Sequence, residues 1–154
     1  EIAIGIDNMN YFYNVPSHMR APEFDTKLQK ILSNGLAPYS IKADAELVTF
    51  FKSQDDYILG KTLTSIGFYA PQGRSLRRDL LRPDFINQIT KAGITNLEME
   101  TSGIYLLASH LGHRAISINA ILANRKTGHF AKDPRKVVDN MIAQALKNIV
   151  SLTE

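Results

Sequence analysis

Cysteine and tryptophan are absent from the sequence, and no hydrophobic run reaches the roughly 18 residues that a membrane span needs. Without cysteine, the chain can form neither disulfide bonds nor cysteine-ligated metal sites, and it has no thiolate nucleophile. Such a composition is compatible with a reducing compartment. Residues 1–7 also lack the basic start and apolar core of a signal peptide. We therefore expect a cytoplasmic protein with no membrane partner.

The sequence has little excess charge of either sign. Its 18 Lys and Arg residues against 15 Asp and Glu residues give a net charge of +3 at pH 7. That excess is a weak argument for a nucleic acid, and a small phosphorylated molecule would fit it equally well. One basic stretch, formed by Arg77, Arg78 and Arg82, has no aromatic residue interleaved as single-strand binding prefers. We expect a solvated face there, and no nucleic-acid partner.

Metal-site patterns are also missing. The four histidines have neither the spacing nor the carboxylate companions of a metal site. They are His18, His110, His113 and His129. We therefore expect no bound metal.

The sequence does contain predicted strands that alternate with predicted helices, as in an α/β protein. Its 154 residues, 44% of them hydrophobic, fit one domain with a buried core, and no linker or repeat marks a boundary. Segments 2–6, 57–65 and 113–123 have the apolar or β-branched content of strands. Helices are expected around Phe24, after the N-cap Asp44, over 84–89 and after Asp133. Strands alternating with helices predict a sandwich with a largely parallel or mixed sheet.

One stretch concentrates the most unusual residues, because Glu98 and Glu100 flank Met99 between two apolar segments. Carboxylates in such a place need partners. The apolar positions from 104 to 111 follow the spacing of one helix face, and Gly112 suits a left-handed stop, so we expect a helix from Glu100. The strand expected over 113–123 ends in Asn-Arg. Because ligands in open α/β sheets bind at strand ends, these segments predict a pocket wall.

Three segments in this order resemble the nucleoside phosphorylase superfamily, and within it the uridine phosphorylases. They are GKTLTSIGFYAPQGR at 60–74, NLEMET at 96–101 and ANR at 123–125. The Glu-Met-Glu core is similar to the superfamily in general, whereas Gln-x-Arg four residues after Phe resembles its pyrimidine-specific members. The resemblance implies a three-layer α/β sandwich and phosphorolysis of uridine to uracil and ribose 1-phosphate, in pyrimidine nucleoside salvage. It implies inorganic phosphate as co-substrate and no cofactor.

The resemblance assigns five residues to the uracil ring. Gln72 would bond the uracil edge, since a side-chain amide offers both a donor and an acceptor. Arg74 would stabilise the negative charge on the departing base and holds its own charge at any working pH. Phe68 would pack against the base, and Leu122 and Ala123 would line its pocket.

It assigns three further residues to the ribose. Met99 would pack against the sugar, Glu100 would accept hydrogen bonds from the ribose hydroxyls, and Glu98 would support Glu100 from nearby. Each assignment has a structural alternative. The two glutamates could instead offset the dipole of a helix start. Phe68 and Met99 could be core residues, and Gln72 and Arg74 could belong to a solvated Pro-Gly loop.

The chain departs from the family pattern at two places. Residues 85–95 form a shorter segment than is usual, and no Gly-Asp-Pro-type phosphate loop occurs. Family members carry that loop in an N-terminal portion and lend a neighbouring subunit a His and an Arg. We therefore expect a single domain over residues 1–154 that lacks the phosphate-binding portion. The complete protein would be a homo-oligomer, either a dimer or a trimer of dimers.

Two other functions stay open. A purine nucleoside phosphorylase or nucleosidase of the same superfamily would usually place Asp after the strand at 116–123 to protonate the purine, whereas this chain has Asn124. A catalytically silent nucleobase-binding or oligomerising module would be compatible with a missing phosphate site. For the fold, the sequence predicts that residues 60–65 and 113–123 are strands of one sheet, with the helix from Glu100 packed on it.

Overall fold

Four strands in the described part of the chain form one mixed sheet. The computed structural model describes residues 1–32, 37–67, 69–72, 74 and 84–152. The strands are β1 (Ile2–Gly5), β2 (Tyr39–Lys42), β3 (Lys61–Thr64) and β4 (Asn96–Glu98). They lie in the order β2-β1-β3-β4, with β1 antiparallel to β2 and parallel to β3, and with β3 parallel to β4. The expected mixed, largely parallel sheet is confirmed.

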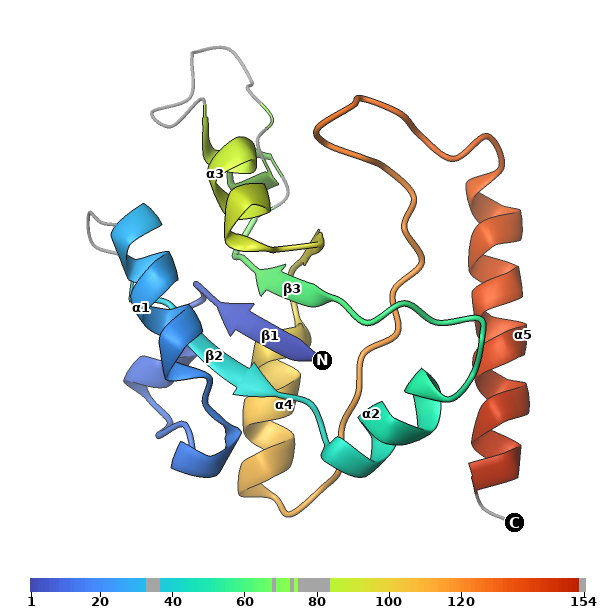
Figure 1. Ribbon diagram of the computed structural model, residues 1–154, viewed down its shortest axis with the longest axis horizontal. Coiled ribbons are helices and arrows are strands. Elements are labelled where there is room, and N and C mark those ends of the chain that lie inside the picture. Colours follow the sequence, from blue (N-terminus) through green and yellow to red (C-terminus); the bar gives the residue numbers. More distant parts are fainter. Residues whose placement is uncertain (33–36, 68, 73, 75–83, 153–154) are drawn as a thin grey trace.

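The described residues also form five α-helices (Figure 1). They are α1 (Pro22–Ile31), α2 (Ala45–Lys52), α3 (Phe85–Ala92), α4 (Thr101–His110) and α5 (Pro134–Leu152). Short 3-10 turns lie at Met9–Tyr11 (η1), Ser17–Met19 (η2) and Ala70–Gln72 (η3). Figure 1 shows α5 at the border of the molecule, beyond the long segment that leads to it from α4.

Alternation along β1 separates two cores, one on each face of the sheet. Ile2 and Ile4 pack with Leu28 of α1 and Ile89 of α3 on one face. The residue between them, Ala3, packs with buried residues of β2 and α4 on the other face, namely Tyr39, Ile41, Tyr105 and Leu106. Helices therefore cover both faces, which confirms the predicted three-layer sandwich.

Local signals set the helix ends as the sequence predicts. Asp44 accepts a hydrogen bond from the backbone N–H of Leu47 at 2.9 Å, and Asp133 accepts one from Lys136 at 3.0 Å. Each carboxylate satisfies an N–H group that has no partner inside its helix. At the far end of α4, Gly112 has a φ of 70°, a left-handed conformation that glycine adopts without strain.

The strand expected over 113–123 is wrong. This segment runs past α4 without joining the sheet, and Ala123 makes an isolated antiparallel bridge to Phe130. Its hydrogen bonds go elsewhere: Ser117 N–H donates to the Tyr105 hydroxyl at 2.8 Å, and Asp44 N–H donates to the Ala115 carbonyl at 3.0 Å. Apolar content indicates that a segment tends to be buried, but it does not supply a neighbouring strand to pair with. The strand expected over 57–65 is confirmed only for Lys61–Thr64.

The closing helix α5 forms where it was expected, but its apolar side chains are incompletely covered. Ile142 is 46% exposed and Leu146 is 60% exposed. One described link to the rest of the chain runs from Asn148 Nδ2 to the hydroxyl of Tyr57 at 3.2 Å. Packing of an amphipathic face normally supplies most of the stability of a helix, so α5 is held weakly.

Gly5 in β1 leaves room for a buried aromatic ring, which makes its substitution a test of the fold. A Cβ atom at this position would lie 2.2 Å from Cε1 of the fully buried Tyr39. We expect Gly5→Ala to lower the free energy of unfolding by about 1–3 kcal/mol, because overpacking displaces the ring. Urea unfolding measures this. Gly103→Ala is the control, since its Cβ would meet nothing closer than 3.9 Å; an equal effect of both substitutions would contradict the prediction.

Candidate active site

A cavity of about 720 Å³ lies where the chain leaves the parallel strands β3 and β4. Its wall comes from η3, α3, the β4–α4 junction and the segment after residue 118. Six of the eight residues that the sequence singled out line it or flank it directly: Gln72, Glu98, Met99, Glu100, Leu122 and Ala123. The expected pocket wall at the strand ends is therefore present, although one of its sides is an irregular segment.

Glu98, the last residue of β4, holds the start of α4 through its carboxylate. One oxygen, Oε2, accepts the backbone N–H groups of Glu100 at 2.7 Å and Thr101 at 2.6 Å. The other, Oε1, accepts the hydroxyl of Thr64 at 2.5 Å. A carboxylate with three donors is well satisfied, and two of those donors belong to the positive end of a helix. Glu98 therefore acts as a cap and supports its neighbours.

Thr64 at the end of β3 extends this arrangement to the next helical residue. Its hydroxyl donates to Glu98 and at the same time accepts the backbone N–H of Ser102 at 2.9 Å. The N–H groups of three successive residues at the start of α4 thus bond to side chains of the sheet. The junction between β4 and α4 has a fixed backbone conformation as a result.

Met99 and Glu100 lie in this junction, between the end of β4 and the start of α4. Both are exposed, and Glu100 is the N-cap residue of α4 but makes no side-chain capping bond there. Glu100 is one of the residues that line the cavity. The two glutamates therefore have different surroundings. The carboxylate of Glu98 is fully engaged in hydrogen bonds that hold the fold. Glu100 makes no capping bond and lies on the wall of the cavity.

At another part of the wall, Gln72 pairs with Arg125. Gln72 is 6% exposed, and its Oε1 accepts a hydrogen bond from Arg125 Nη2 at 3.1 Å. This bond fixes which end of the Gln72 amide is the acceptor. Sequence reasoning included Arg125 in the family resemblance but gave it no role; the signal was the Asn-Arg pair at the expected strand end.

Arg74 does not line the cavity. Arg74 lies after η3, where its guanidinium carbon is 5.0 Å from the centre of the Tyr69 ring, a cation–π distance. It is exposed, and its backbone N–H donates to the Tyr69 carbonyl at 2.9 Å. Phe68 lies outside the described residues, as do Arg77, Arg78 and Arg82.

A tight turn follows the cavity residues Leu122 and Ala123. The Oδ1 atom of Asn124 accepts the backbone N–H groups of Lys126 at 3.0 Å and Thr127 at 3.1 Å. Such side-chain-to-backbone bonds are the usual role of Asn in turns. The turn returns the chain so that Ala131 N–H meets the Leu122 carbonyl at 2.8 Å, which closes this side of the cavity.

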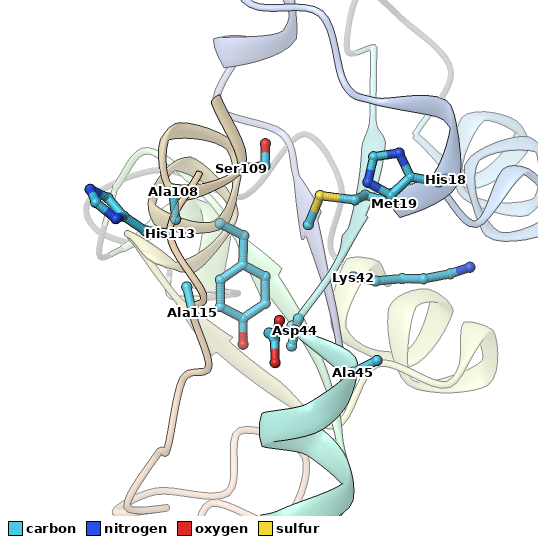
Figure 2. Close-up of a pocket in the computed structure, with 11 residues that line it drawn as sticks. His18, Met19, Lys42, Asp44, Ala45, Ala108, Ser109, His113 and Ala115 are labelled. Carbon is cyan, nitrogen blue, oxygen red and sulfur yellow. The ribbon is translucent and has the colours of Figure 1, made fainter. Parts of the chain in front are cut away.

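A second cavity, of about 390 Å³, lies between η2, β2, α2 and α4. Tyr105 is one of the residues that line it, and burial raises the pKa of that hydroxyl. Figure 2 shows the side chains of Lys42 and His113 pointing in opposite directions. None of the described residues that the resemblance assigns to a nucleoside lines this cavity, in contrast to the one beside Glu100.

A sandwich with a cavity beyond its parallel strand ends, lined by apolar residues and a few polar ones, is typical of a ligand-binding α/β protein. Comparison with known families then identifies it: the chain belongs to the Phosphorylase superfamily, whose family model matches residues 3–154. Among the described residues, no group of three or more His, Asp or Glu side chains is arranged to hold a metal ion. None of the described helices is long and apolar enough to cross a membrane.

Individual relatives include enzymes for both classes of nucleoside. The uridine phosphorylase of Thermococcus kodakarensis is 32% identical over 106 residues, which cover 64% of this chain and 36% of that protein. A DeoD-type purine nucleoside phosphorylase of Aliivibrio salmonicida is 27% identical over 96 residues, which cover 61% of this chain and 36% of that protein.

A solved structure supports the fold. The nucleoside phosphorylase of Trypanosoma brucei, described as showing uridine phosphorylase activity, matches with a TM-score of 0.77 at 22% identity. The match covers 97% of this chain and 56% of that one. The chain thus spans little more than half of the solved relative, and the two sequence matches cover 36% of each curated relative.

The different roles of the two glutamates can be tested by stability. We expect Glu98→Ala to lower the free energy of unfolding by about 2 kcal/mol, because two helix N–H groups and the Thr64 hydroxyl lose their acceptor. Glu100→Ala, two residues away, is the matched control and should change it by less than about 0.5 kcal/mol, as exposed positions usually do. Denaturant unfolding of both variants checks this, and equal losses would disprove the assignment.

Proposed function

We propose that the chain carries the nucleoside-binding part of a uridine phosphorylase, which cleaves uridine with phosphate to give uracil and ribose 1-phosphate in pyrimidine salvage in the cytoplasm. The observation that carries the proposal is the cavity that gathers Gln72 and Arg125 with the exposed carboxylate of Glu100. Membership of the superfamily supports phosphorolysis as the reaction class. Similarity to a uridine phosphorylase supports the pyrimidine substrate.

The donors around Gln72 suit the uracil ring. Arg125 donates to Oε1 of Gln72, so the two hydrogens on Nε2 remain to bond a carbonyl oxygen of the base. The second lone pair of Oε1 can accept a hydrogen bond from a ring N–H. Arg125 brings positive charge to the same place, and we propose that Arg74 adds more from the adjoining loop. Uracil leaves as an anion, so cations near its carbonyl oxygens stabilise the transition state. Phe68 keeps its proposed role against the base.

The carboxylate of Glu100 suits the ribose. Ribose hydroxyls are donors, and the carboxylate of Glu100 is an acceptor on the cavity wall. The cap formed by Glu98 fixes the backbone on which Glu100 stands, and the 40% exposed Met99 offers an apolar surface to the sugar. This supports the roles that the sequence resemblance implies for the three residues.

Purine nucleosides are the competing substrates, since purine nucleoside phosphorylases are also similar to this chain. Asn124 favours the pyrimidine alternative. A departing purine gains from protonation of its imidazole ring, and the side chain of Asn124 supplies no acid; its oxygen is already engaged by two N–H groups of the turn. Uracil needs no such proton.

The described part of the chain offers few hydrogen-bond donors that could bind phosphate. A helix N-terminus is the usual backbone cradle for phosphate, but at α4 the N–H groups of Glu100, Thr101 and Ser102 bond to Glu98 and Thr64. A carboxylate at that position also repels an anion. We propose that phosphate is bound by a further portion of a longer protein, as the family resemblance implies, within a homo-oligomer.

Binding of bases to the 154-residue chain tests the pocket directly. We expect weak binding of uracil, detected by NMR chemical-shift changes, and weaker binding of hypoxanthine. Gln72→Ala should reduce uracil affinity about tenfold, equivalent to about 1.4 kcal/mol for two lost hydrogen bonds. Gln29→Ala on the exposed side of α1 is the control. Preference for hypoxanthine, or equal effects of the two substitutions, would contradict the proposal.

The same chain should not catalyse phosphorolysis. Without a positioned phosphate, the reaction loses the proximity contribution, which can amount to about 7–11 kcal/mol of the barrier. Incubation with uridine and phosphate, followed by chromatography of released uracil, should give no turnover above the uncatalysed background. Turnover at the rate of an ordinary enzyme would show that residues treated above as structural form a phosphate site.

A further inference from the structure

Asp7 is a carboxylate that the proposed reaction does not use, and it lies close behind the candidate active site. It follows the end of β1 and is partly buried. Its Oδ1 accepts the backbone N–H of Met9 at 3.1 Å, and its Oδ2 accepts the hydroxyls of Ser102 at 2.8 Å and Tyr39 at 3.3 Å. All three donors are neutral, so hydrogen bonds, and not an ion pair, hold this carboxylate.

The contact with Ser102 connects Asp7 to the first turn of α4. Ser102 is fully buried, and its backbone N–H bonds to Thr64, the residue that also binds Glu98. The next residue, Gly103, lies so close that a Cβ atom there would be 3.9 Å from Asp7 Oδ2. The helix start is therefore held on two sides, by the Glu98 and Thr64 side chains and by Asp7.

Tyr39 fixes Asp7 from the opposite direction. Its ring is fully buried across Gly5 of the neighbouring strand, so its hydroxyl has little freedom to move. Burial raises the pKa of this hydroxyl, which therefore remains a neutral donor at every physiological pH. Strand β2, strand β1 and helix α4 thus meet at one carboxylate.

We propose that Asp7 is a positioning residue for the ribose-binding carboxylate of Glu100. Glu100 is the N-cap of α4, two residues before Ser102, so a shift of the first helical turn moves Glu100 as well. Asp7 is not among the residues that line the cavity. It acts through Ser102, and this inference rests on the proposed nucleoside site.

Amide hydrogen exchange tests the positioning without any ligand. In Asp7→Ala, the amides of Glu100 and Thr101 should exchange at least about tenfold faster relative to the amides of the β1–β2 pair, because the first turn opens locally. Using strand amides as the internal reference removes any general loss of stability. Ser102→Ala should produce the same local effect. Asp7→Asn should restore most of the protection, since an amide can still pair with two hydroxyls that both donate and accept.

Asp25 provides a matched control. It is also a partly buried carboxylate that accepts a backbone N–H, that of Ser40 at 2.6 Å, but it lies on α1 away from α4. Asp25→Ala should lower overall stability without increasing exchange at Glu100 and Thr101 relative to the strands. A relative increase equal to that of Asp7→Ala, or none in Asp7→Ala and Ser102→Ala, would overturn the proposal.

Ligand affinity gives the functional readout, measured by NMR titration as the ratio of uridine to uracil affinity. Asp7→Ala should lower this ratio about threefold and leave uracil affinity near that of the unsubstituted chain, because the ribose contacts alone depend on Glu100. An unchanged ratio would overturn the positioning role. Equal affinity for uridine and uracil in the unsubstituted chain would instead overturn the proposed ribose contact, while the exchange experiment would still decide whether Asp7 holds the helix start.

Discussion

The architecture of the candidate site depends on the carboxylate of Glu98, which joins the end of the sheet to the start of α4. Its two oxygens accept two helix N–H groups and the hydroxyl of Thr64. Burying part of a charge is costly unless it is well bonded, and here the partners are the positive end of a helix and a neighbouring strand. The residues displayed next to it, Met99 and Glu100, owe their position to this cap.

The residues that line the cavity carry opposite charges, and that arrangement would suit the two halves of the proposed nucleoside substrate. Gln72 and Arg125 meet at one part, where a base with carbonyl oxygens would find donors. Glu100 stands at another, where hydroxyl groups would find an acceptor. An acidic residue also disfavours free phosphate beside it, so the proposed nucleoside site would be separate from the place where a phosphate anion binds.

Much of the fold could be predicted from local signals. Asp44, Asp133 and Gly112 mark helix ends through bonds or backbone angles that depend on a few neighbouring residues. The segment 113–123 could not be predicted correctly, because a strand needs a partner and periodicity does not reveal one. For the site, the resemblance selected a stretch around Glu98 that lines the cavity. It could not show that Glu98 is bonded on both oxygens or that Arg125 holds Gln72, since both facts arise from contacts between distant parts of the chain.

The sparse covering of α5 has a consequence for the cooperativity of unfolding. A helix whose Ile142 and Leu146 stay about half exposed contributes little free energy to the sheet and receives little from it. We therefore expect the helix and the sheet to unfold as separate cooperative units, each with its own free energy of unfolding. Stability measured at Tyr39 of the sheet and stability measured from helix content would then report on different parts of the molecule.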